Sequence, residues 1–193
     1  MNIFYLHPSP GKCARWHCDK HVVKMILETA QLLYTAHWVL AKDAGAQPAL
    51  TTAPPPKTRP TEHGYMSIHN PKHPSAIWTR DSLQHYKWLC ELGLALCVEF
   101  RHRFGDKAHS CEAHILWLYY HVPAQIPDKG WTQPPKAMPD QYKRSKNSVI
   151  CYRIYYTEAK TALLKYTARH RPHWIQTSLS SSSEIIRSYI PRQ

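Results

Sequence analysis

Apolar and polar positions repeat with a helical period from Arg15 to about Trp38. This stretch contains no Gly or Pro and many good helix formers, so it predicts one long helix. Its polar side chains share an arc of about 100° on a helical wheel, and this polar stripe consists of His17, Lys20, His21, Lys24, Glu28, Gln31 and Thr35. A helix that is apolar over most of its circumference is largely buried. We therefore expect the polar stripe to line a cleft and to hold the functional site.

Turn-forming residues divide the rest of the chain into further predicted helices. Ser9 followed by Pro10 is typical of a helix start, with Ser9 as the N-cap. Ser75 is predicted to cap the second helix, and Gly105 to end it. Four helices are expected, over residues 10–42, 76–104, 108–122 and 148–169.

Long Pro-rich connections separate these helices. Residues 43–68 are too polar to pack on their own, so this connection is predicted to be mobile. Residues 123–147 contain five prolines, which disfavour a long regular element. A flexible C-terminal tail is expected over residues 179–193, after the start of a Ser-rich run. The sequence therefore predicts one compact all-α domain, residues 1–178, with about four helices.

The charge balance indicates the kind of partner. The 193 residues include 25 Lys and Arg against 13 Asp and Glu, a formal net charge of +12. Such an excess favours a polyanionic partner, with nucleic acid as the first choice. A basic surface that is merely solvated is the alternative. A hydrophobic fraction of 43% is enough for a real core.

Cysteine usage and the N-terminal sequence bear on location. The six Cys form no CxxC pair, and no apolar run is long enough to act as a signal peptide or to cross a membrane. We therefore expect a cytoplasmic protein, located in the host cell if it is viral. No membrane partner is expected, and the protein is predicted to be a monomer.

His17 and His21 are four residues apart, a spacing that could direct both imidazoles at one divalent metal ion. No second pair of ligands at metal spacing accompanies them. An acid–base or anion-facing role is therefore favoured, and no metal or other cofactor is expected. For either residue, a buried imidazole hydrogen-bonded to the backbone remains an open interpretation. A metal-dependent hydrolase that uses His17 and His21 is kept as an alternative function.

Glu28 is the only acid on the polar stripe, one turn after Lys24. On an exposed helix the two residues would form an ion pair worth about 0.3 kcal/mol. In a cationic and partly dry cleft, a lone carboxylate can stabilise a developing cation or move a proton. Glu28, His21 and His17 are therefore the candidate catalytic residues.

Other basic and aromatic residues are candidates for nucleic-acid binding. The candidate phosphate contacts are Lys20, Lys24, Arg80 and Arg153. The candidates for stacking on bases include Tyr152, Tyr156 and Trp174. Solvated charges and core aromatics are the competing interpretations. A protein that only binds nucleic acid, in which Glu28 merely pairs with Lys24, is a further alternative.

Asp19-Lys20-His21, with Glu28 seven residues after His21, resembles the pyrimidine-dimer DNA glycosylases of phage (endonuclease V type). Residues 148–174 also resemble the last helix and aromatic tail of that family. The resemblance implies an all-α glycosylase and AP lyase, in which a free α-amine forms a Schiff base with the damaged nucleotide. It further implies that Glu28 stabilises the cationic sugar and that His21 contacts DNA or the active site.

The chain departs from that family at two places. The family's amine is exposed by removal of Met1, whereas Asn2 is not a residue behind which removal is expected. The family's arginines one before and three after the glutamate are here Leu27 and Gln31. We retain Asn2 among the expected nucleic-acid-binding residues.

The whole run from His17 to Glu28 also resembles a second phage group. These are glycosylase-like enzymes of thymidine hypermodification, the α-glutamyl/putrescinyl thymidine pyrophosphorylases or amino acid:DNA transferases. The resemblance implies that a small amine or amino acid displaces pyrophosphate from 5-pyrophosphorylated hydroxymethyluracil in double-stranded DNA. The stripe's imidazoles and lysines would hold the pyrophosphate, and Glu28 would deprotonate the amine or stabilise the methylene cation.

This second resemblance requires no N-terminal nucleophile, so the nature of Asn2 does not count against it. We therefore predict a phage-type enzyme that modifies a pyrimidine base in DNA, on a DNA-glycosylase-like scaffold with Glu28 central. A pyrimidine-dimer DNA glycosylase/AP lyase is the first alternative.

Overall fold

The computed structural model describes residues 2–55 and 70–176, which form helices and connecting segments and contain no β-strand. The described residues contain two short 3-10 helices, Asp140–Tyr142 and Thr161–Leu163, and seven α-helices: α1 (Pro10–Trp16), α2 (Asp19–Asp43), α3 (Pro74–Asp81), α4 (Leu83–Phe104), α5 (Glu112–Tyr120), α6 (Ser148–Ala159) and α7 (His173–Gln176). The all-α prediction is confirmed, but there are more helices than the four expected.

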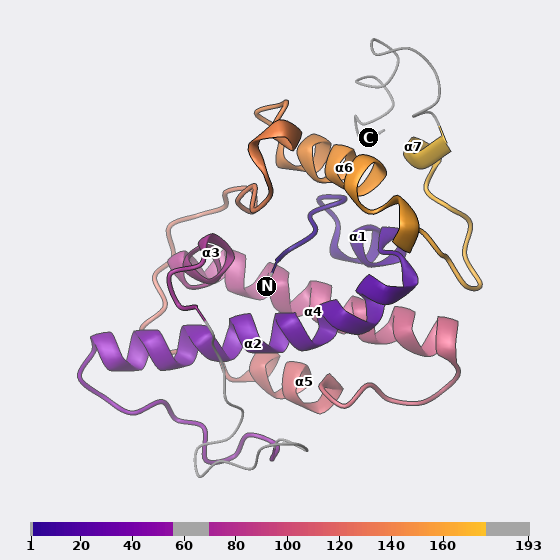
Figure 1. Ribbon diagram of the computed structural model, residues 1–193. Helices are drawn as coiled ribbons and strands as arrows, with labels where there is room; N and C mark the ends of the chain where they lie inside the picture. The colour runs from indigo at the N-terminus through magenta and orange to yellow at the C-terminus, as the bar shows by residue number, and fades with distance from the viewer. Residues whose placement is uncertain (1, 56–69, 177–193) are drawn as a thin grey trace.

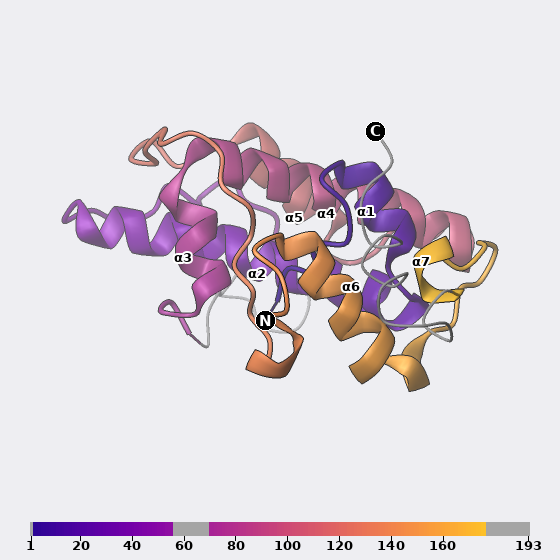
Figure 2. The same cartoon turned by 90° about the horizontal axis from the view of Figure 1, so that it is seen from above.

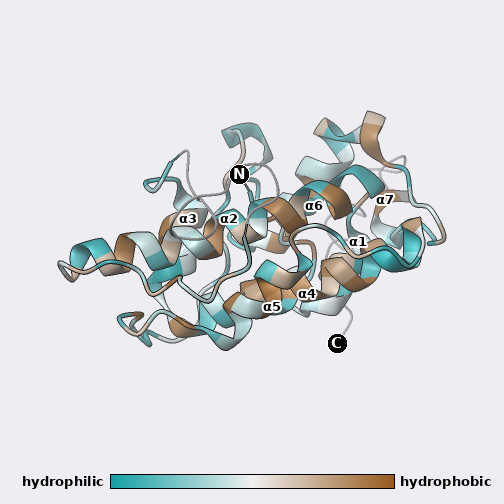
Figure 3. Ribbon diagram, turned by 90° about the horizontal axis from the view of Figure 1, so that it is seen from below, coloured by the Kyte–Doolittle hydropathy of each residue, from teal (hydrophilic) through white to brown (hydrophobic). Residues whose placement is uncertain are grey.

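Helix α4 is central, because it contacts α1, α2, α3 and α5. Helices α2 and α4 run side by side, with α5 below them and α6 and α7 above (Figure 1). The view from above shows α6 lying over the N-terminal segment, residues 2–6 (Figure 2). Viewed from below, the helices carry alternating apolar and hydrophilic bands, as expected when each buries one face (Figure 3).

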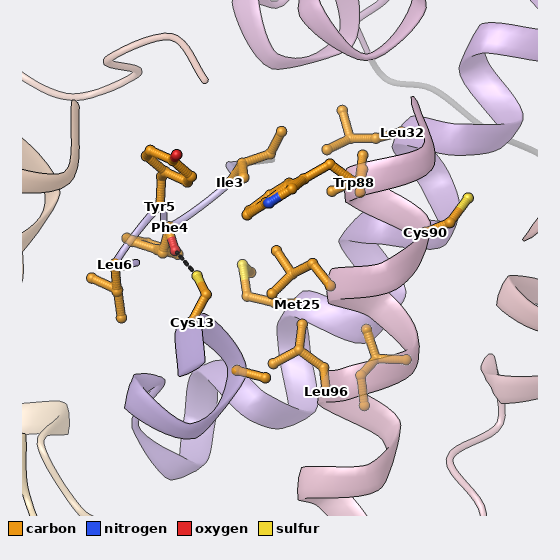
Figure 4. Packing of buried hydrophobic residues seen from close by; sticks show 14 of the residues in the cluster. Ile3, Phe4, Tyr5, Leu6, Cys13, Met25, Leu32, Trp88, Cys90 and Leu96 are labelled. Carbon is orange, nitrogen blue, oxygen red and sulfur yellow. Dashed lines mark hydrogen bonds between the residues drawn. The ribbon is translucent and has the colours of Figure 1, made fainter. Parts of the chain in front are cut away.

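The N-terminal segment forms part of the core. Its side chains from Ile3 to Leu6 are all at most 6% exposed. They lie beside Met25 of α2 and Leu96 of α4, and the Cys13 thiol donates to the Phe4 carbonyl at 3.3 Å (Figure 4). Residues 2–6 therefore occupy the space next to α2 that the sequence had suggested as an open cleft.

The predicted first helix is interrupted, because His17 and Cys18 adopt extended backbone conformations between α1 and α2. Partners that are distant in the sequence satisfy the backbone groups that this break frees. The Arg103 guanidinium donates to the carbonyls of Arg15 and His17 at 2.9 and 2.8 Å. The Asp19 N–H donates to the Lys165 carbonyl at 2.8 Å. One continuous helix was therefore a wrong prediction, since its interruption depends on residues far away in the sequence.

The predicted second helix is also divided, at Ser82, into α3 and α4. The Leu83 N–H, freed at the start of α4, donates to the Pro127 carbonyl at 2.7 Å. His73 is the N-cap of α3, in place of the predicted Ser75. Gly105 ends α4 as predicted, with φ of 86°.

The last two predicted helices are shorter than expected. Helix α5 spans Glu112–Tyr120, and α6 ends at Ala159 instead of near residue 169. The chain after α6 instead supplies Thr167, whose N–H and hydroxyl both donate to the Asp19 carboxylate.

The Pro-rich connection after α2 is in part packed. Leu50 is 1% exposed, and the Trp117 indole donates to the Thr52 hydroxyl at 3.1 Å. The remainder of the predicted mobile connection, residues 56–68, and the predicted tail, residues 179–193, lie outside the described residues. No helix in the described ranges is long and apolar enough to span a membrane.

Candidate functional site

Glu28 lies in the middle of α2 beneath the N-terminal segment and is 8% exposed. Its Oε2 accepts a hydrogen bond from the backbone N–H of Asn2 at 2.8 Å. Its Oε1 lies 3.3 Å from the Lys24 ammonium group, whose side chain is 67% exposed. The carboxylate therefore has a partly buried backbone donor on one oxygen and a solvent-facing cation on the other.

Asn2 is held by contacts with three separate parts of the chain. Besides its bond to Glu28, it donates through Nδ2 to the Ala137 carbonyl at 2.8 Å. Its Oδ1 lies 2.7 Å from the Tyr152 hydroxyl, which is also 2.7 Å from the Pro135 carbonyl. Helices α2 and α6 and residues 135–137 therefore fix the backbone nitrogen of Asn2 against Glu28.

His21 lies under Phe4 on the same helix as Glu28. The two rings stack with centroids 4.2 Å apart, and Nδ1 is hydrogen-bonded to the Tyr156 hydroxyl. Burial lowers the pKa of His21 to about 3, and the positive charges of Lys160 and Lys24 act in the same direction. Seven residues along a helix place its backbone about 10 Å from that of Glu28. His21 is thus neutral at physiological pH and lies about two helical turns from Glu28.

His17 does not lie on the cleft-facing polar stripe predicted for it. It lies at the break between α1 and α2, is 0% exposed, and its Nδ1 is 2.7 Å from the Cys13 carbonyl. Burial lowers its pKa to about 4. This placement matches the interpretation as a buried, backbone-bonded imidazole and does not suit a residue in contact with substrate.

The exposed edge of α2 differs from the predicted polar stripe, because two of the residues on this edge are apolar. Lys20 and Lys24 are exposed, and so are Val23 at 41% and Leu27 at 37%. Thr35, at the far end of the stripe, is 0% exposed and donates to the Gln31 carbonyl. The edge that reaches solvent beside Glu28 is therefore both basic and apolar.

The other expected nucleic-acid contacts are Arg80, which is partly exposed, and four buried residues. Arg80 donates to the Pro71 carbonyl at 2.8 Å and borders a groove of about 910 Å³ near the C-terminal half of α2. The remaining candidates, each 0% exposed, are Arg153, Tyr152, Tyr156 and Trp174. Burial does not fit the phosphate contact predicted for Arg153 or the base stacking predicted for the three aromatics.

These buried residues have structural contacts instead. The Arg153 guanidinium lies over the rings of Trp16 and Trp174, 4.7 and 5.5 Å from their centroids. Tyr152 positions Asn2, and Tyr156 positions His21. Hydrophobic periodicity offers no signal for these two hydroxyl contacts, because they link residues 150 and 135 positions apart in the chain.

Sequence reasoning did not place His73 near Glu28 and did not identify the role of Asp19. His73 Nδ1 accepts from the Ser75 N–H at 3.1 Å, and burial lowers its pKa while the nearby Glu28 carboxylate opposes that change. Asp19 forms an ion pair with Arg103 at 3.0 Å and is 8% exposed. His73 therefore lies close enough to Glu28 for their charges to interact, and Asp19 anchors the start of α2.

No three His, Cys, Asp or Glu residues within the described ranges are grouped so that they could hold a metal ion. His17 and His21 have their ring centroids 6.5 Å apart, and each uses Nδ1 for a bond within the protein. This arrangement gives the metal-dependent hydrolase no support.

Comparison with known proteins identifies no relative. Neither a family model, nor a curated protein, nor a solved structure matches the chain. We therefore base the proposed function on the geometry around Glu28 and on the charge of the protein.

Proposed function

We propose that this protein is a DNA-acting enzyme that modifies a pyrimidine base, with Glu28 as its central carboxylate. The observation that carries the proposal is the fixed position of this carboxylate, 2.8 Å from the Asn2 nitrogen and 3.3 Å from the Lys24 ammonium. Its side chain retains 10% exposure, so a substrate atom can reach it while bulk water is largely excluded. Such a preorganised charge is effective where positive charge develops in a reaction.

The reaction is a substitution at the methylene carbon of 5-pyrophosphorylated hydroxymethyluracil in double-stranded DNA. The nitrogen of an amine or amino acid forms a bond to that carbon, the carbon–oxygen bond breaks, and pyrophosphate leaves with the electron pair. The amine nitrogen then loses a proton, for which the Glu28 carboxylate is the acceptor. If the carbon–oxygen bond breaks first, the same carboxylate stabilises the methylene cation.

The exposed edge of α2 supplies the cations for the leaving group. Lys20 and Lys24 are both exposed and lie on the same side of the helix, one turn apart. His17 and His21 are buried and have lowered pKa values, so we assign neither of them the charge of a pyrophosphate ligand. The net charge of +12 supports binding of the duplex around this edge.

A pyrimidine-dimer glycosylase/AP lyase is the second candidate, because the nitrogen bound to Glu28 belongs to residue 2. An α-amine at that position would be aligned with the carboxylate. In this sequence, however, the nitrogen of Asn2 is the peptide amide joined to Met1, and an amide is not a nucleophile. The lyase therefore requires removal of Met1, whereas the substitution reaction does not.

The test compares wild-type protein, Glu28→Gln and the control Glu91→Gln, which removes an exposed carboxylate of α4. Each is incubated with mixed amines and amino acids on three duplexes: undamaged, UV-irradiated, and carrying pyrophosphorylated hydroxymethyluracil. Products are analysed by nucleoside mass spectrometry, pyrophosphate release and borohydride trapping.

An amine-substituted base on the activated duplex alone, absent with Glu28→Gln and present with Glu91→Gln, is the expected result. A trapped adduct on irradiated DNA would instead establish the lyase. If all three proteins bind DNA equally and form neither product, both chemistries are refuted and a binding protein remains.

A further inference from the structure

A second cationic site lies at the other end of the N-terminal segment from Glu28. It is a cavity of about 260 Å³ lined by His7, Lys12, Arg15, Trp16 and His173. Lys12 and Arg15 are exposed, whereas His7 is 9% exposed. Its lining, among the described residues, includes two permanent cations and two imidazoles but no carboxylate.

A backbone hydrogen bond sets the tautomer of His7, and burial keeps its imidazole neutral. The Ser9 N–H donates to His7 Nδ1 at 2.9 Å, so this nitrogen acts as an acceptor. In a neutral imidazole the proton then resides on Nε2, which becomes a hydrogen-bond donor. Burial lowers the pKa of His7 to about 4, and Lys12 and Arg153 act in the same direction, so this neutral form persists at physiological pH.

A third permanent charge lies behind the cavity wall. The Arg153 guanidinium, 0% exposed, packs 4.7 Å from the centre of the Trp16 ring and donates through Nε to the Leu6 carbonyl at 3.0 Å. A buried charge is screened less than an exposed one, so it adds to the positive potential at Trp16. Lys12 and Arg15 of α1 line the cavity and Arg153 of α6 lies behind Trp16, so these positive charges favour an anion there.

We infer that the cavity between α1 and α7 is a phosphate-binding site, and that its ligand is a backbone phosphate of the DNA duplex. Lys12 and Arg15 would supply charge-assisted hydrogen bonds, and His7 a neutral donor fixed by Ser9. The DNA assignment rests on the proposed function, whereas the affinity for a phosphate group does not.

The position of the site suits a contact flanking the modified nucleotide. Asn2 touches Glu28 and His7 lines the cavity, and five residues span at most about 18 Å. At a rise of about 3.4 Å per base pair, this corresponds to no more than about five base pairs. The separation between Glu28 and the cavity is therefore within the length that one duplex can span.

The experiment measures binding to an undamaged duplex, so that it does not depend on catalysis. Wild-type protein is compared with Lys12→Ala/Arg15→Ala and with the charge-matched control Lys87→Ala/Lys107→Ala, which changes two exposed lysines outside the cavity. Affinity is determined as a function of salt concentration. The imidazole nitrogens of His7 are followed by NMR in 15N-histidine-labelled protein during titration with duplex, inorganic phosphate or pyrophosphate.

Loss of one phosphate contact should reduce the magnitude of the slope of log affinity against log salt by about 0.9. Affinity at low salt should fall about tenfold for Lys12→Ala/Arg15→Ala and change little in the control. The His7 resonances should shift on addition of duplex to the wild type and not to that variant.

Equal slopes for the two double variants, with His7 unmoved by any ligand, would overturn the site. A response of His7 to phosphate or pyrophosphate but not to duplex would overturn the DNA assignment. Base modification could fail in all proteins while these shifts persist, so the two proposals are refuted by different results.

Discussion

Arg103→Met should destabilise the protein strongly, because this one side chain joins α1, α2 and α4. The Arg103 side chain is 0% exposed and forms ion pairs with Glu99 at 2.8 Å and Asp19 at 3.0 Å. It also donates to two backbone carbonyls at the break between α1 and α2. Methionine would fill much of the volume but leave these acceptors without their donor.

We expect a loss of about 3–5 kcal/mol in the free energy of unfolding, the usual cost of removing one partner of a buried ion pair. Arg169 still binds Glu99, and Thr167 still binds Asp19, so the loss should not exceed this range. Against a typical total of about 5–15 kcal/mol, the variant should fold with little reserve. Urea unfolding followed by circular dichroism measures the change.

Arg101→Met is the matched control. Its guanidinium pairs with Glu112 at 2.9 Å, but the side chain is 35% exposed, and exposed ion pairs contribute little to stability. If Arg103→Met loses no more stability than Arg101→Met, then the buried network does not stabilise the break between α1 and α2. The explanation given for this break would be wrong.

The pH dependence provides a second measurement on the same variant. Burial alone would raise the pKa values of Asp19 and Glu99, but hydrogen bonds from Thr167 to Asp19 and from Arg169 to Glu99, together with Arg103, lower them below their usual values. A carboxyl with a depressed folded-state pKa contributes stability above its unfolded pKa and loses it as the pH falls through the folded value. Wild-type stability should therefore decline below about pH 4, and Arg103→Met should show a smaller decline.

Three further predictions concern other buried groups. Tyr152→Phe removes the hydroxyl that holds Asn2 and should cost about 1–3 kcal/mol in urea unfolding. Gly93→Ala would place a Cβ 2.8 Å from a Thr29 methyl group and should destabilise by about 1–2 kcal/mol, whereas Gly11→Ala meets nothing within 4 Å and should not. His17 has a folded-state pKa of about 4, whereas an unfolded histidine titrates near about 6.5. The unfolded chain therefore binds a proton more readily, so His17 destabilises the fold below about pH 6.5 and has no such effect above it. Between pH 7.5 and 5 it should cost about 2 kcal/mol, and His17→Gln should lose correspondingly less on acidification.

The candidate site could be predicted only in part. The predicted first helix has many apolar positions and a narrow polar stripe, which is evident from residue spacing alone. Glu28 is the single carboxylate on that stripe, so the sequence was enough to identify it. The partner of this carboxylate, the Asn2 nitrogen, depends on how residues 2–6 pack against α2. The same packing buries His21 and leaves Lys24 exposed, although both lie on the predicted stripe.

Local sequence determined the helical class of this protein. Helical periodicity, Pro10 at the first turn of α1 and Gly105 after α4 are local signals, and each corresponds to a feature of the structure. Tertiary contacts decided where the long predicted helices break. The chain can leave the helix at Cys18 because the Lys165 carbonyl accepts the N–H of Asp19. It can do so at Ser82 because the Pro127 carbonyl accepts the N–H of Leu83. A backbone group can leave a helix at little cost when a distant partner replaces its hydrogen bond, and helical periodicity does not reveal that partner.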